Sequence, residues 1–270
     1  MNGRYQLREI VAAGGMGTIW LARHVTLHSP VALKLMRHDA ALDDPSGNLL
    51  REARITSALR SAHIVQVHDF GFDRGRAYMA MEYLEGESLA ARLQRCKRLD
   101  LSATCRVLGD LARGLERVHQ ANVVHLDLKP ENAFIVMAGE TETVKLLDFG
   151  VALASVEQNG ADASPFLLGT PLYMSPEQAR WGESIDLRSD VWGLGVIAFE
   201  CLVGRPAFWG DTLHDVLTAI GSGRCPIPSA SGCVITGFDA WFARACAQDP
   251  ARRFDSAREA ADALERLAER

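Results

Sequence analysis

The feature that most constrains this chain is a polar loop enclosed by apolar sequence near its middle. Residues 123–137 read VVHLDLKPENAFIVM, so Asp127 and Asn132 lie in a proline-containing loop between two apolar runs that predict strands. Farther on, VKLLDFG at 144–150 places Asp148 directly after another apolar strand, sixteen residues beyond Asn132. Chance is a poor explanation for fixed residue types at such offsets, so we interpret the two segments as one constellation.

The residue types in these segments fit phosphoryl transfer. The amide of Asn132 and the carboxylate of Asp148 are oxygen donors that suit Mg²⁺, which keeps phosphates and waters as its other ligands. Asp127 supplies a second carboxylate that can accept a hydroxyl proton, and Lys129 supplies a cation that can neutralise a phosphate. Each residue taken alone is more simply a group that closes a turn. Only the ordered set favours a reaction that depends on positioning and charge stabilisation.

The first 85 residues read as strands with one helix. Short β-rich runs separated by glycine or His-Ser-Pro turns predict an antiparallel meander. Leu50, Ala53, Ile55 and Leu59 have near-helical spacing, with Ser46 as the candidate N-cap. The predicted strands are 5–13, 17–24, 29–36, 65–73 and 76–84, and the predicted helix is 46–60.

The sequence pattern changes to helical after Gly86. Apolar residues recur at helical spacing through 101–120, and Ser256 to Glu259 fit a capping box that opens the last helix. Further helices are predicted at 186–203, 211–221, 237–247 and 256–269. A small β-rich part followed by a mainly helical part predicts an α+β chain with two lobes, divided near Tyr83–Gly86.

Composition excludes several classes of protein. The 270 residues are 48% hydrophobic and 23% charged, which is ordinary globular usage. The net charge of −5 gives no general attraction to nucleic acid or to an anionic membrane, and neither partner is expected. The longest apolar stretch, 191–204, is too short to cross a bilayer, and the N-terminus has no secretory signal. The six cysteines form no C-x-x-C pair and read as reduced thiols, so a cytoplasmic location is expected.

The motifs together resemble a known family. HLDLKPEN followed by DFG is similar to the catalytic and metal-binding loops of eukaryotic-like protein kinases, and LKPEN resembles the serine/threonine-specific branch. GGMG, EYLEGESL and GTPLYMSPEQA resemble bacterial kinases of this type. The resemblance covers nearly the whole chain. It implies a bilobal kinase fold over 1–270, with a small antiparallel N-lobe at 1–84 that carries one helix and a larger, mainly helical C-lobe at 85–270.

The resemblance also implies catalytic roles. Asp127 would orient and deprotonate the substrate hydroxyl, and Lys129 would steady the γ-phosphate. Thr170 would hydrogen-bond near both of them, whereas Asn132 and Asp148 would hold Mg²⁺, or Mn²⁺ in its place. The acceptor would be a serine or threonine hydroxyl of a protein substrate, and self-phosphorylation is the second acceptor reaction that such a site allows.

A nucleotide site follows from the same resemblance. Lys34 would grip the α/β-phosphates with Glu52 as its partner, and Met81 would be the gatekeeper behind adenine. A residue near Phe134 or Ile135 would close the adenine pocket. Taken singly, these features fit a solvated ion pair, a hairpin turn and a sheet core almost equally well. The residues assigned to ATP are Val11, Ala12, Ala13, Gly14, Gly15, Met16, Gly17, Thr18, Ile19, Ala32, Lys34, Glu52, Met81, Glu82 and Leu84.

Two further positions have structural roles in the family. Glu177 would pair with a buried Arg253, and Asp190 would cap the backbone of the catalytic loop. The sequence departs from the family pattern at Ala12, where the first loop glycine is expected, and at Leu126, where arginine is usual.

Leucine cannot pair with a phosphate, and residues 148–177 contain no Lys or Arg. We therefore predict that phosphorylation of this segment, at Ser155 or Ser164 for example, is not an obligatory switch for activity.

Three functions remain open from the sequence. The first is an ATP-dependent serine/threonine protein kinase. The second is a pseudokinase or scaffold that binds nucleotide, which Ala12 and Leu126 support and the complete set of catalytic residues opposes. The third is a small-molecule phosphotransferase, which the peptide-docking character of GTPLYMSPE opposes. A domain of this kind is also compatible with the cytoplasmic part of a longer membrane protein.

Overall fold

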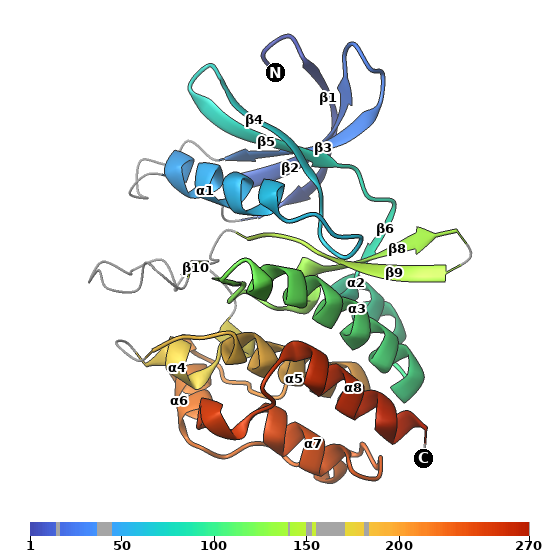
Figure 1. Ribbon diagram of the computed structural model, residues 1–270, viewed down its shortest axis with the longest axis vertical. Helices are drawn as coiled ribbons and strands as arrows, with labels where there is room; N and C mark the ends of the chain where they lie inside the picture. The colour runs from blue at the N-terminus through green and yellow to red at the C-terminus, as the bar shows by residue number, and fades with distance from the viewer. Residues whose placement is uncertain are drawn as a thin grey trace.

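The computed structural model describes residues 1–14, 17–36, 45–139, 141–149, 153–154, 171–180 and 184–269 (Figure 1). Five antiparallel strands form the N-terminal sheet in the order β1-β2-β3-β5-β4. Helix α1 (Pro45–Ala58) lies against the β4 and β5 side of this sheet. The strands are β1 (Tyr5–Ala13), β2 (Gly17–His24), β3 (Pro30–Met36), β4 (Val67–Asp73) and β5 (Arg76–Glu82).

Local chemistry explains the β4–β5 hairpin. Asp73 pairs with Arg76, so the connection has only two residues, Arg74 and Gly75. Both have positive φ values, 51° and 78°, as a turn that follows the right-handed twist of the strands requires. The tight turn fixes the register of β5, and β5 leads into the segment that joins the two parts of the chain.

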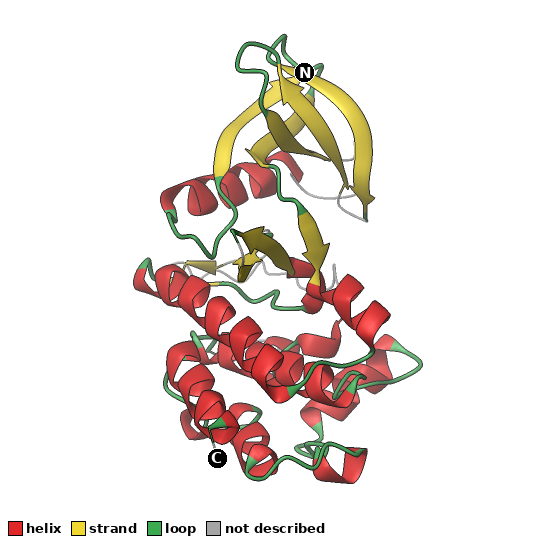
Figure 2. Ribbon diagram, turned by 90° about the vertical axis from the view of Figure 1, so that its right-hand side faces the viewer, coloured by secondary structure: helices red, strands yellow, loops and turns green. Residues whose placement is uncertain are grey.

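Helices form the lower part of the molecule (Figures 1 and 2). Helix α5 (Arg188–Val203) is the central one, because its apolar residues surround the axis and nearly all of them are buried. Helices α3 (Leu101–Gln120), α7 (Phe238–Ala245) and α8 (Ala257–Ala268) pack against it. Helix α4 (Pro176–Ala179) packs on α6 (Leu213–Gly221), and α2 (Leu89–Cys96) packs on the small second sheet. None of the described helices is both long and apolar enough to span a bilayer.

A small second sheet lies between these parts (Figure 2). Its order is β6 (Gly86–Ser88), β8 (Ala133–Ala138) and β9 (Thr141–Leu146), and the polar loop precedes β8. Strand β7 (Val123–Val124) pairs with β10 (Leu153–Ala154). The turn after α1 is fastened to β9, because Leu146 N donates to His63 O at 2.9 Å and Val65 N donates to Leu146 O at 3.0 Å. These bonds join the segment between α1 and β4 to the small second sheet.

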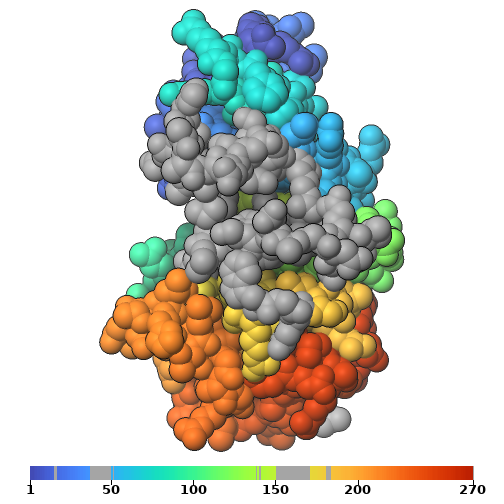
Figure 3. All heavy atoms as spheres, turned by 90° about the vertical axis from the view of Figure 1, so that its left-hand side faces the viewer, coloured from blue at the N-terminus to red at the C-terminus, as the bar shows by residue number. Residues whose placement is uncertain are grey.

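The described residues confirm the predicted α+β order, with a β-rich upper part that carries one helix and a helical lower part. The space-filling view shows the sheet and α1 above and α6 with the C-terminal helices below (Figure 3). Two predictions of detail were wrong or incomplete. Helix α1 begins at Pro45, so Ser46 lies in its first turn and is not the residue that caps it. Helix α2 was not predicted, because eight residues span too few turns for a clear apolar period.

Candidate active site

The backbone of the polar loop is held from α5. Asp190, whose side chain is fully buried, accepts hydrogen bonds from His125 N and Leu126 N, each at 2.9 Å. This is the cap predicted for Asp190. The sequence analysis missed His119 in the last turn of α3, whose Nε2 lies 2.7 Å from Asp190 Oδ2. The sequence feature that could have indicated this contact is a histidine in the last turn of the helix before the loop.

Asp127 is oriented by two neighbours on the same loop. Lys129 Nζ lies 2.8 and 2.6 Å from its two carboxylate oxygens. Asn132 Nδ2 donates to the backbone oxygen of Asp127 at 2.9 Å and to Oδ2 at 2.8 Å. The Asp127 side chain keeps 23% of its surface exposed, so the carboxylate is positioned and still accessible to an acceptor hydroxyl.

Three residues far apart in sequence meet beneath the upper sheet. Lys34 Nζ, on β3, donates to both Glu52 oxygens on α1 at 2.9 Å and to Asp148 Oδ1 at 3.1 Å. Burial acts to lower the pKa of Lys34, but the carboxylates of Asp148 and Glu52 outweigh it and raise that pKa. Burial, and then the Asp148 carboxylate, raise the pKa of Glu52. The arrangement holds a protonated lysine beside Asp148.

Asn132 and Asp148 have the chemistry that a hard divalent cation needs. Leu147 N donates to Asn132 O at 2.8 Å, which brings the residue before Asp148 against the loop. The Asn132 amide nitrogen donates to Asp127, so its oxygen is the atom that it can offer to a cation. The described residues contain no group of three His, Cys, Asp or Glu suited to a metal. A pair of oxygen donors fits Mg²⁺ that takes its remaining ligands from phosphates and water.

The glycines of the β1–β2 hairpin differ in what they accommodate. A Cβ atom at Gly17 would lie 2.1 Å from Leu35 O on β3, so close approach of two strands already requires glycine there. A Cβ atom at Gly14 would meet nothing within 4 Å. Gly14 N donates to Gly17 O at 2.9 Å, so a contact of Gly14 with a phosphate stays a prediction. The hairpin register pairs Ala12 with Ile19 and Ala13 with Thr18.

The end of β5 forms the back of the expected adenine pocket. Met81 pairs with Ala32 of β3 and is buried. Glu82 N donates to Gln66 O at 2.9 Å. Because this N–H group is already bonded, the backbone group that Glu82 can offer to a base is its carbonyl oxygen. The Glu82 carboxylate accepts from Gln66 N at 2.8 Å and from Lys145 Nζ at 2.7 Å. The ion pair with Lys145, which the sequence did not reveal, ties the connecting segment to β9.

The structure separates the two candidates for the floor of this pocket. Ile135 is buried in the helical core and faces a different pocket, so Phe134, its neighbour on β8, lies on the opposite face of the strand. Leu84 packs against the cluster that contains Met81. Val11 is 54% exposed, so its contact with a base stays a prediction.

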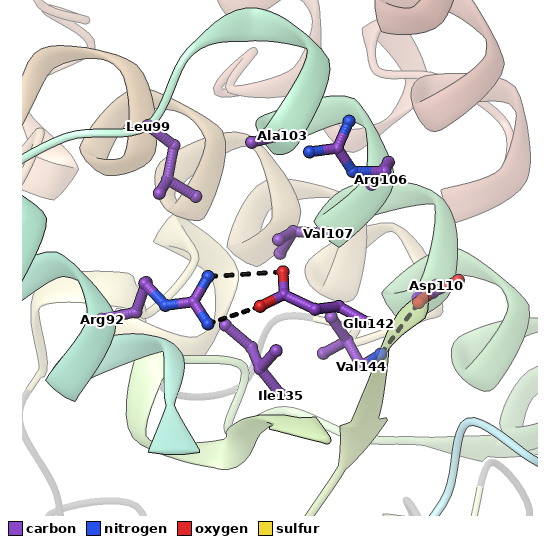
Figure 4. Close-up of a pocket in the computed structure, with 9 residues that line it drawn as sticks. All are labelled: Arg92, Leu99, Ala103, Arg106, Val107, Asp110, Ile135, Glu142 and Val144. Carbon is purple, nitrogen blue, oxygen red and sulfur yellow. Dashed lines mark hydrogen bonds and ion pairs between the residues drawn. The ribbon is translucent and has the colours of Figure 1, made fainter. Parts of the chain in front are cut away.

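The second pocket lies between α2, α3 and the β8–β9 hairpin (Figure 4). In it, Arg92 NH2 lies 2.7 Å from Glu142 Oε1, and Val144 N donates to Asp110 Oδ2 at 2.8 Å. None of the residues assigned to catalysis or metal binding lines this pocket. This pocket is therefore distinct from the candidate active site.

The predicted pair of Glu177 and Arg253 is present and deeply buried. Arg253 NH1 and NH2 lie 2.6 and 2.7 Å from the two Glu177 oxygens, with 0% and 2% of the side chains exposed. Burial acts to raise the pKa of Glu177, but hydrogen bonds from Arg253 outweigh it and the pKa is lowered. The pKa of Asp190 is lowered too, because its hydrogen bond with His119 and the charges of His119 and His125 outweigh burial.

Acid is expected to weaken the fold through Glu177 and Asp190. Both bind protons less tightly in the folded chain than in the unfolded chain. Their contribution to stability is therefore complete above about pH 5 and is lost as the pH falls through the folded-state pKa. Thermal unfolding between pH 6 and pH 3 should show a steeper loss in the wild type than in Asp190→Asn. Equal slopes would contradict this assignment.

Several predicted residues lie outside the described part of the chain. They are Gly15, Met16, Ser155, Ser164 and Thr170, whose roles stay predictions.

Comparison with known proteins identifies the family. A family model described as the protein kinase domain matches residues 5–227. The serine/threonine-protein kinase PknB of Mycobacterium leprae is 36% identical over 96% of this chain and 42% of its own length. The serine/threonine-protein kinase pkn2 of Myxococcus xanthus is 35% identical over 98% of this chain and 32% of its own length. The chain thus spans less than half of the curated relatives that it matches. The family match, the order of the motifs and the contacts of Lys34 with Glu52 and Asp148 agree, and they show that this chain belongs to the protein kinase family.

Proposed function

We propose that this chain is an ATP-dependent serine/threonine protein kinase that transfers the γ-phosphate to hydroxyl groups of protein substrates. We also propose that residues 1–270 form one kinase domain, with an N-lobe at 1–84 and a C-lobe at 85–270. The observation that carries the proposal is the contact of Lys34 with both Glu52 and Asp148, because it brings the phosphate-binding lysine of the upper sheet to the metal-binding carboxylate below. The names of the relatives support serine and threonine as acceptors.

Each residue has a defined task in this reaction. Asp127 accepts the proton of the acceptor hydroxyl, in an orientation set by its bonds to Asn132 and Lys129. Lys129 places its ammonium group where the hydroxyl meets the phosphate, and Lys34 holds the rest of the nucleotide. Asn132 and Asp148 would hold Mg²⁺, or Mn²⁺ in its place, and the ion would supply positive charge near the transferring group. Incubation with γ-labelled ATP, Mg²⁺ and a protein acceptor tests the proposal, by acid-stable label on serine or threonine.

The scaffold alternative rests on Ala12 and Leu126. Leu126 keeps its backbone N–H bond to Asp190, and its side chain is buried. The bond to Asp190 uses the backbone of Leu126, so the leucine leaves the catalytic loop held.

Loss of the Lys34 ammonium group should impair nucleotide use. We expect Lys34→Met to lower kcat/KM for ATP by about a hundredfold or more, because the variant removes a preorganised cation from the phosphates. Steady-state assays and fluorescent nucleotide titration measure the change. Lys97→Met, at an exposed lysine, is the control and should stay near wild type. Unchanged ATP kinetics in Lys34→Met would remove this lysine from the site.

Phosphorylation of the segment before α4 should not be needed for activity. We expect Ser155→Ala, Ser164→Ala and phosphatase-treated wild type to stay within about twofold of untreated enzyme, because Leu126 provides no cation for a phosphate. Initial rates of the four preparations under identical conditions measure this. A tenfold loss in any of them would show that a phosphate is required.

A further inference from the structure

The peptide group between Leu126 and Asp127 is hydrogen-bonded through both its oxygen and its N–H group. Its oxygen, Leu126 O, accepts a hydrogen bond from Gln178 Nε2 at 2.9 Å. Its N–H, on Asp127, lies 3.3 Å from His125 Nδ1. Because a peptide group is planar, these two bonds fix the orientation of the whole unit and with it the direction in which the Asp127 side chain leaves the backbone.

This peptide group needs to be held. Leu126 has a φ of 65°, in the left-handed region that a residue with a β-carbon rarely adopts. Rotation of the peptide group between Leu126 and Asp127 changes ψ of Leu126 and φ of Asp127, and it would turn Asp127 away from Lys129 and Asn132. Asp190 fixes only the N–H side of Leu126, at 2.9 Å, so its carbonyl side depends on Gln178.

The side chain of Gln178 is suited to this task by having a donor and an acceptor. Its Oε1 accepts from Ser175 N at 3.1 Å and from Ser175 Oγ at 3.0 Å, while its Nε2 donates to Leu126 O. A carboxylate could keep the bonds to Ser175 but could not donate to a carbonyl oxygen, and an apolar side chain could do neither. The side chain is buried, so water does not easily replace either bond.

The helix that carries Gln178 is itself anchored. Glu177, the preceding residue, forms the buried pair with Arg253 and accepts from Ser189 Oγ at 2.6 Å. Adjacent residues of α4 thus bind two different structures, the base of α5 through Glu177 and the catalytic loop through Gln178. The end of the substrate-facing segment is joined to the catalytic loop without a phosphate or an arginine at position 126.

We propose that Gln178 is a positioning residue for Asp127, acting through the carbonyl group of Leu126. The proposal rests on the kinase function proposed above. It gives that function a physical basis for working without the arginine that relatives of this family carry at position 126.

The first test separates this role from a purely structural one. Gln178→Met should lower kcat by about tenfold or more and leave KM for ATP within about twofold, because a displaced catalytic group affects turnover and not nucleotide binding. Gln178→Glu keeps the acceptor for Ser175 and loses the donor to Leu126, so we expect at least the same loss of kcat. Wild-type kcat in Gln178→Glu would show that the donor to Leu126 O is not needed, and that result would overturn the proposal.

The matched control is Gln248. It also donates from Nε2 to a backbone oxygen, Ile220 O at 2.8 Å, and accepts from Arg180 NH2 at 3.1 Å, but it has no contact with the catalytic loop. Gln248→Met should keep kcat near the wild-type value. An equal loss of kcat in Gln248→Met and Gln178→Met would assign the effect to general destabilisation and would overturn the proposal.

A second readout does not depend on catalysis. Amide hydrogen exchange of the segment 123–132 should be at least about tenfold faster in Gln178→Met than in wild type and Gln248→Met, because the peptide group loses one of its two restraints. Unchanged exchange would overturn the positioning role even if the wild type transfers phosphate. Faster exchange together with an inactive wild type would support the restraint and contradict the proposed kinase function instead.

Discussion

Replacement of Asp127 by asparagine is expected to lower kcat for protein phosphorylation by about two to four orders of magnitude. Asparagine has nearly the shape of aspartate but cannot accept the hydroxyl proton. The loop is also held by Asp190 and Gln178, neither of which contacts the Asp127 carboxylate, so the fold should persist. Transfer of label from γ-labelled ATP to a protein acceptor, with nucleotide binding measured in parallel, gives the two quantities.

The control for this variant is the same substitution at Asp239. Its carboxylate, in the first turn of α7, accepts from Ser229 N at 2.9 Å, at the start of a short 3₁₀ helix. Asp239→Asn should retain wild-type activity. Transfer by Asp127→Asn at the wild-type rate would exclude Asp127 as the base. A wild type that binds ATP and transfers nothing would favour the scaffold.

Replacement of Arg253 by methionine is expected to cause the largest loss of stability. It leaves the Glu177 carboxylate buried without its ion-pair partner, and it leaves the carbonyl oxygens of Ala247 and Arg188 without the donors that bind them at 2.8 Å each. Removal of one partner from a buried pair costs about 3–5 kcal/mol. For a chain of this size that corresponds to a fall in Tm of about 6–20 °C. Thermal unfolding followed by circular dichroism measures the shift.

The comparison is with Arg258, which pairs with Asp262 at 2.8 Å on the exposed side of α8. Arg258→Met should change the free energy of unfolding by less than about 1 kcal/mol, because solvent screens an exposed pair. Similar Tm values for the two variants would show that burial does not determine how much the Arg253–Glu177 pair contributes to stability.

Local features of the fold were accessible from the sequence. The strands, the long helix over 101–120 and the capping serine at the start of α8 follow from apolar period and from turn and cap chemistry, which act within a few residues. The loop with Asp127, Lys129 and Asn132 is also local, so the sequence located it, but the bonds of Lys129 and Asn132 to Asp127 were not predicted. Helix α2 escaped prediction because it is short.

Other features depend on contacts between distant segments. Gly17 reads as a loop glycine in the sequence, but packing of β2 on β3 already requires it. Gln178 is an ordinary polar residue in the sequence, and only the placement of α4 against the loop gives it the contact with Leu126. No pattern within either segment encodes these neighbours.

The sequence by itself indicated the family and the order of a β-rich part and a helical part, and it predicted which residues carry the chemistry. The tertiary structure alone decided that Asp148 joins the predicted pair of Lys34 and Glu52, and that Gln178 holds the side of Leu126 opposite to the predicted cap Asp190. The reason is physical. Side-chain types and short periods act along the chain, whereas these hydrogen bonds join segments whose distance is set by strand register and by the packing of helices around α5.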